Sequence, residues 1–213
     1  MPLEDAKLLT CAYIILNKNV PTEEDPDFTQ NFLITLFDSP QNTLIQPAPF
    51  GLQVLSPGKH SVRRFVFNPA KIQIVTESAL GLIQAAGRVF EQLRKQTFTL
   101  EPSAYGLNYE FDFKAPEGQT AMSWLGKRFA SPGLPGLPAT AKVKLMSLDI
   151  VLEGVDNLRR FKLEPRTEVA DRVFGYANFH FDEKRLLQGE QLEHAVTQGY
   201  EKCINLVTSL LRL

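Results

Sequence analysis

Apolar and polar residues alternate along several short stretches in the first third of the chain, as is typical of β-strands. The stretch "LLTCAYIIL" (8–16) is instead almost continuously apolar, which predicts a strand buried on both faces. Two further strands are expected at "NFLITLF" (31–37) and "KIQIVTE" (71–77). Between them, residues 50–67 predict two short strands around the turn residues 56–58, Ser-Pro-Gly. We therefore expect the first third to be mainly β-sheet.

Two long segments show helical periodicity. In residues 78–95 the apolar side chains recur at steps of three and four, at Ala79, Leu82, Ile83, Ala86, Phe90 and Leu93. In residues 187–211 the spacing is close to a heptad repeat, at Leu192, Val196, Tyr200, Cys203, Val207 and Leu210. A shorter helix is expected from about residue 118. The long helices each have an apolar side that a sheet can cover.

Three consecutive strands are predicted in the last third, at 142–153, 158–165 and 173–182. Their connections are too short for crossover helices, so we expect an antiparallel meander. The predicted fold class is α+β, with a mainly antiparallel sheet and the two main helices packed on one face of it.

A segment rich in Pro and Gly at 130–141 divides the chain into two parts. The first part, 1–129, is a β-rich half with one long helix. The second part, 142–213, is the three-stranded meander with the C-terminal helix. Because each part alone is short of a complete core, we expect 130–141 to be a crossing loop within one shared core.

One phrase occurs twice, in "FTLEPSAYGLNYEFDF" (98–113) and "FKLEPRTEVADRVFGYANFHFD" (161–182). Both begin F-x-L-E-P and end with Asn, an aromatic residue, any residue, Phe and Asp. An internal duplication of a strand–loop–strand–helix unit would explain the likeness. Convergence of two Phe-rich strands would explain it as well.

Strand geometry sorts the residues of the two copies into faces. The aromatic face should pack on the helices, with Phe111 and Phe181 both buried. The polar face would carry the candidate site residues, which are Asn108, Glu110, Asp112, Asn178, His180 and Asp182. Such a set could hold a divalent cation or share acid–base work between a carboxylate and a histidine. It could equally be the solvated face of an antiparallel sheet, with the asparagines bonded to a neighbouring loop or bulge.

Composition and charge exclude little. The chain has 23 basic and 24 acidic side chains and a net charge of −1, which disfavours nucleic acid as a partner. It has no apolar run of about 20 residues for a membrane helix, and its first residues do not resemble a secretory signal. A cytoplasmic location is expected. Cys11 and Cys203 form neither a disulfide framework nor a metal pair by spacing.

No phosphate loop, dinucleotide fingerprint, nucleophile elbow or zinc spacing occurs in the sequence, and no cofactor or metal is expected. The resulting hypothesis is a non-catalytic binding or adaptor protein that acts through a sheet face or edge. A small-molecule hydrolase or metal-dependent enzyme using the polar face is the alternative, so enzymatic activity stays open; a nucleic-acid-binding protein is a second alternative. A homodimer is expected, because apolar residues occupy more than one side of the C-terminal helix at Ile204, Leu206, Val207, Leu210, Leu211 and Leu213.

Overall fold

A computed structural model describes residues 5–18, 44–48, 51–55, 62–68, 70–95, 100–129, 147–151 and 157–212. Within these ranges the chain has the predicted α+β fold, with an antiparallel sheet of nine strands in the order β2-β3-β4-β5-β1-β6-β9-β8-β7. The strands are β1 (Lys7–Asn17), β2 (Leu44–Ala48), β3 (Gly51–Leu55), β4 (Val62–Asn68), β5 (Lys71–Thr76), β6 (Pro102–Lys114), β7 (Leu148–Val151), β8 (Leu158–Pro165) and β9 (Arg172–Phe181). The helices are α2 (Ala79–Lys95), α3 (Ala121–Phe129) and α4 (Gly189–Arg212).

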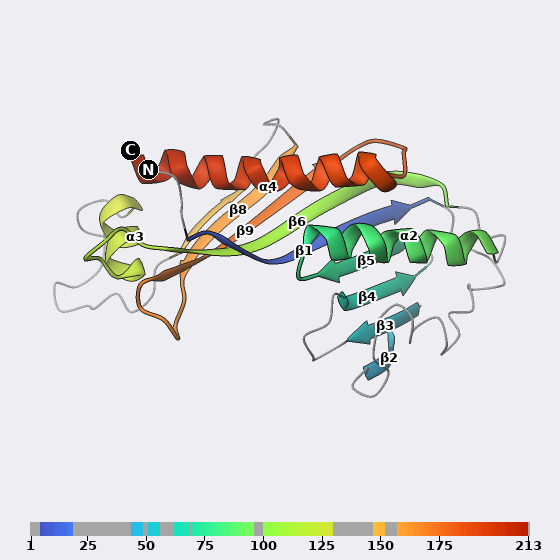
Figure 1. The fold of residues 1–213 in the computed structure, drawn as a ribbon, viewed down its shortest axis with the longest axis horizontal. Coiled ribbons are helices and arrows are strands. Elements are labelled where there is room, and N and C mark those ends of the chain that lie inside the picture. Colours follow the sequence, from blue (N-terminus) through green and yellow to red (C-terminus); the bar gives the residue numbers. More distant parts are fainter. Residues whose placement is uncertain are drawn as a thin grey trace.

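The two long helices α2 and α4 pack against each other and on the same face of the sheet, as Figure 1 shows. The Ser78 hydroxyl accepts a hydrogen bond from the Gly81 amide at 3.1 Å and so caps the start of α2. The short helix α3 lies on the same face, because Trp124 packs edge-on against Phe113 of β6. We call this side the helix-covered face and the opposite side the helix-free face, since no described helix packs on it.

Alternation along the strands determines which side chains meet the helices. On β6 the predicted aromatic face is buried throughout, with Tyr105, Leu107, Tyr109, Phe111 and Phe113 each at most 2% exposed. On β1 the same face carries Cys11, Tyr13 and Ile15, which are fully buried. Ile14 and Leu16 point to the helix-free face and are only partly buried. Burial of this strand on both faces is therefore less complete than its apolar sequence predicts.

Two buried tyrosines fix α4 above the sheet. The Tyr109 hydroxyl of β6 donates a hydrogen bond to the Val196 carbonyl at 2.9 Å. The Tyr13 hydroxyl of β1 accepts one from the Leu187 amide, also at 2.9 Å. Burial raises the pKa of both phenols, which keeps them protonated even well above neutral pH. The aromatic side chains thus fill the core and also set the position of the helix.

The meander is confirmed, because β7 pairs antiparallel with β8 and β8 with β9. Strands from both predicted halves meet where β6 pairs with β9. The predicted strand at 31–37, the crossing loop at 130–141 and the start of the segment 142–153 lie outside the described residues. The division of the chain into two parts and the duplication therefore stay predictions.

The two copies of the repeated phrase occupy partly equivalent places. Their second halves form the neighbouring strands β6 and β9, with Asn108 directly opposite Asn178. Their first halves differ, because Phe161–Pro165 belongs to β8, whereas Leu100 and Glu101 lead directly into β6.

Phe181 is less buried than the sequence predicts. Phe111 is fully buried, but Phe181 is only half-buried at the end of β9. Its ring still stacks on Tyr105 of the helix-covered face, with a centroid distance of 4.5 Å. The assignment of faces is therefore correct, although Phe181 lies at the end of the strand and lines a cavity under α4.

Candidate functional site

The six candidate residues do not form one cluster. Antiparallel pairing places Asn108 opposite Asn178, with Asn178 Nδ2 donating to Asn108 Oδ1 at 2.5 Å. Glu110 lies two residues to one side of this pair, and His180 lies two residues to the other side. At about 3.4 Å per residue the two side chains are about 14 Å apart along the strands. The asparagines bond to each other, and within the described residues neither makes the expected bond to a loop or bulge.

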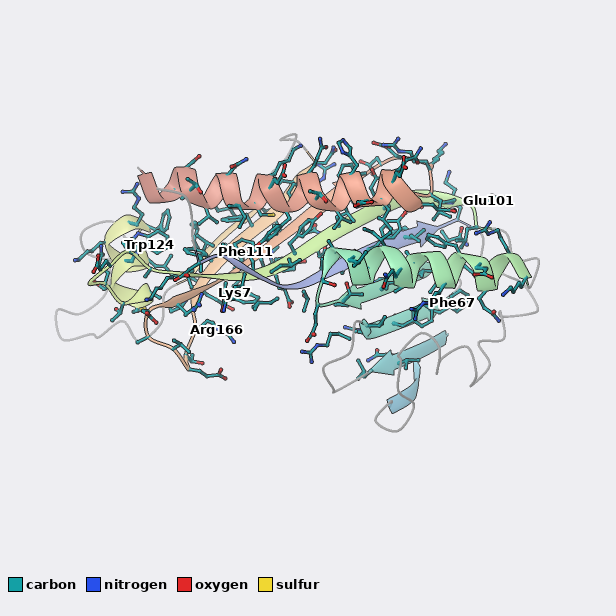
Figure 2. The ribbon with its side chains drawn as sticks, in the orientation of Figure 1. Lys7, Phe67, Glu101, Phe111, Trp124 and Arg166 are labelled. Carbon is teal, nitrogen blue, oxygen red and sulfur yellow. The ribbon has the colours of Figure 1, made fainter. Side chains whose placement is uncertain are left out.

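Asp112 holds a salt-bridge cluster at one end of the helix-free face. Its carboxylate accepts from Arg166 Nη1 at 2.9 Å and from Arg172 Nη1 at 3.3 Å. Lys7 of β1 lies opposite Asp112 in the register, and Figure 2 shows Lys7 and Arg166 in this part of the molecule. Asp112 is only 5% exposed. The cluster ties the β8–β9 connection to β6. The Asp112 carboxylate and its two arginines therefore have a structural role.

His180 and Asp182 form a pair at the other end of this face. His180 Nε2 lies 2.9 Å from Asp182 Oδ1, and Arg159 Nη2 lies 3.4 Å from Asp182 Oδ2. The side chain of Asp182 is 75% exposed. A histidine paired with a carboxylate can act as a base when a substrate is held beside it. In the described part of the chain, however, the Glu110 and Asp112 carboxylates lie away from it.

Between these ends, charged side chains pair within the face. The Thr10 hydroxyl donates to Glu110 Oε2 at 2.8 Å. Arg160 makes two hydrogen bonds to Asp149, at 2.9 and 2.6 Å, which hold the pKa of that carboxyl below its usual value. Neighbouring charges of opposite sign leave this part of the face with little net field.

The described residues contain no group of three His, Cys, Asp or Glu side chains placed to bind a metal ion. The two cysteines are free thiols buried in the core, at opposite ends of the chain's sequence. Burial raises the pKa of Cys11 to about 11 and that of Cys203 to about 12, so neither is a reactive thiolate at neutral pH.

Sequence reasoning missed a groove on the helix-covered side, which we call the α4 groove. It consists of two adjoining cavities of about 270 and 200 Å³ between α4 and the sheet, and Phe179 and Lys202 line both. Arg185 and Lys202 can be read in the sequence, but their closeness to the aromatic residues of β9 cannot. Only the position of α4 across the strands brings them together.

Comparison of the chain with models of protein families and with curated proteins finds no match. Among the described helices, none has both the length and the apolar composition needed to cross a lipid bilayer.

Proposed function

We propose that this chain is a non-catalytic binding protein whose helix-free face receives a protein partner. The observation that carries the proposal is one row of side chains across this face. Asn108, Asn178, Arg160 and Val151 lie side by side on β6, β9, β8 and β7. Val151 is 76% exposed, more than any other large apolar side chain in the described part. Arginine is enriched among the residues that contribute most to protein interfaces, and the amides beside it can exchange hydrogen bonds with a partner.

The chemistry of the neighbouring row supports the same partner class. Tyr176 is half-buried on β9 and lies opposite both Glu110 and Lys162. Lys162 pairs with Glu164 at 2.5 Å. Tyr and Arg are the residues that most often dominate the binding energy of protein interfaces. The interleaved charges of both signs favour a protein with a mixed surface over a polyanion such as RNA or DNA.

The shape of the surface also disfavours a small-molecule enzyme. Both cavities of the α4 groove lie on the helix-covered side, so neither opens on the helix-free face. Glu110 and Asp112 lie away from His180 along the strands and are paired with Thr10 and with arginines. Asp182, the carboxylate beside His180, lies 3.4 Å from Arg159. A face with paired charges suits contact over a broad area more than catalysis.

Site-specific crosslinking tests the proposal. A photoreactive phenylalanine analogue replaces Val151 in one variant and Gln84, exposed on α2, in a control variant. We expect irradiation of cells that make the protein to yield a discrete adduct from position 151 and none from position 84. The adduct is identified by mass spectrometry, and the partner is then purified.

A binding measurement with that partner completes the test. Arg160→Glu should weaken its affinity at least about tenfold, because a cation of the contact row becomes an anion, while the melting temperature stays close to that of the wild type. Equal crosslinking from both positions, or an unchanged affinity of the Arg160→Glu variant, would contradict the proposal.

A further inference from the structure

We propose that the α4 groove is a binding site for a medium-chain carboxylate, a ligand with one anionic head and an apolar chain. This site is separate from the helix-free face, because the sheet lies between them. The two cavities of the groove differ in chemistry, and a lysine lies at their junction.

The smaller cavity, of about 200 Å³, is almost wholly apolar. Beside Lys202 and Asn205, its lining consists of Leu158, Phe161, Ala177, Phe179, Cys203 and Leu206. A water molecule occupies about 30 Å³ of liquid, so the space holds about seven groups of that size. Burying an alkyl chain of this length removes apolar surface from water, which is favourable at about 25 cal/mol per Å². The cavity therefore fits the chain of such a ligand.

The larger cavity, of about 270 Å³, has an aromatic floor and a cationic rim. Tyr105 and Phe181 stack with a ring-centroid distance of 4.5 Å, and both line this cavity together with Arg185. Arg185 is also ion-paired with Glu183. These two charges offset each other, so the cation still free to receive an anion must come from elsewhere in the lining.

Lys202 supplies that cation. It projects from α4 at the junction of the two cavities and lines both. Within the described part of the chain Lys202 forms no ion pair. Glu183 is the sole carboxylate among the lining residues of the larger cavity, and it is already ion-paired with Arg185. A carboxylate bound to Lys202 would leave its chain lying directly over Phe179 into the apolar cavity. The head and the chain of the ligand thus match adjacent parts of the groove in charge and polarity.

The groove is held in its shape before any ligand binds. A Cβ atom at Gly199 would collide with the Tyr109 hydroxyl, so only glycine lets α4 come this close to the sheet. That hydroxyl donates to the Val196 carbonyl one turn away. A helix fixed at this distance keeps the groove open without a rearrangement, and a preorganised site binds its ligand with less loss of entropy.

Isothermal titration with sodium octanoate tests the site on the full chain. We expect saturable binding with one ligand per chain, and we expect neither octylamine nor acetate to bind. Lys202→Gln should weaken octanoate binding by at least about tenfold, the loss of one charge-assisted contact. Leu206→Trp should abolish binding by filling the apolar cavity. Lys184→Gln, an exposed lysine outside the groove, is the matched control and should bind as the wild type does.

Three results would overturn the inference. One is the absence of saturable octanoate binding to the wild type at millimolar concentrations. Another is octylamine binding as tightly as octanoate, which would show that the negative charge of the ligand does not contribute to binding. The third is an affinity of Lys202→Gln equal to that of Lys184→Gln. Because Lys202 is exposed on α4, its substitution leaves the core intact, and an unchanged melting temperature verifies this.

Discussion

The two faces of strand β6 lie a few ångströms apart and are stabilised in different ways. Tyr109 and Phe111 on the helix-covered face are almost completely buried, whereas Asn108 and Glu110 on the helix-free face are partly exposed and bonded to single polar partners. In a close-packed core a change of side-chain volume is costly, while paired polar groups near water can be replaced at small cost. The residues that hold the fold thus lie on one face of β6, and the residues that we propose for partner contact lie on the other.

Phe111→Ala should have the largest effect. The ring is fully buried and packs near Phe113, Phe161 and Tyr200. We expect the free energy of unfolding to fall by about 3–5 kcal/mol, from lost burial and the cavity left behind. Phe181→Ala should reduce it less, since that ring is half-buried. Urea unfolding of both variants measures the difference. Equal losses of free energy would contradict the finding that Phe181 is less buried than Phe111.

Gly175→Ala should also destabilise the helix-covered face. Gly175 lies opposite Phe111, and a Cβ atom there would collide with the Phe111 ring. Forcing the ring aside should lower the free energy of unfolding by about 1–3 kcal/mol. Gly87→Ala on α2 is the control, because its Cβ would meet open space and alanine favours helix. A Gly175→Ala variant as stable as Gly87→Ala would show that the ring moves freely.

Alkaline pH should lower the free energy of unfolding, because thiols are buried at the helix-covered face. Burial raises the pKa of Cys11 from 9.0 to about 11, so the unfolded chain releases this proton at a lower pH than the folded chain does. The stabilisation is complete below pH 9.0 and is lost as the pH rises to about 11. We expect a loss of roughly 2 kcal/mol from this thiol, with Cys203 adding a similar loss. Urea unfolding of the Cys11→Ala/Cys203→Ala variant should show a smaller decrease over that range; an equal decrease would exclude the thiols as the cause.

The asparagine pair should matter least among these changes. Asn108→Ser and Asn178→Ser each remove one partner of a single hydrogen bond on the helix-free face. We expect a loss of about 1 kcal/mol for either variant and little more for the double variant, since the pair contributes one shared bond. A double-mutant cycle measures the coupling. Fully additive losses would mean that each asparagine has its own structural role.

The sequence predicts the faces of the strands and the two long helices because these depend on local period. Tyr105 and Phe111 recur every second residue, and Leu82 and Phe90 follow helical spacing, so burial follows directly. Which polar residues meet depends instead on the direction and register of pairing. Antiparallel pairing brings Asn108 to Asn178 but separates Glu110 from His180.

Loop and helix placement set the remaining features of the site. Arg166 reaches Asp112 only because of the path of the connection between β8 and β9. The α4 groove likewise depends on where the helix crosses β9, which no periodicity of Gly199 or Lys202 encodes. Long-range packing of this kind is invisible to a reading of single segments.

The helix-covered face holds the fold, and we propose that the helix-free face is available to a partner. The most direct test is the free energy of unfolding of a variant in which Val151, Arg160 and Lys162 are all changed to Ser. We expect a melting temperature and a urea midpoint close to those of the wild type, because these side chains are exposed or paired near water. A loss as large as that of Phe111→Ala would contradict it and would make this face part of the core.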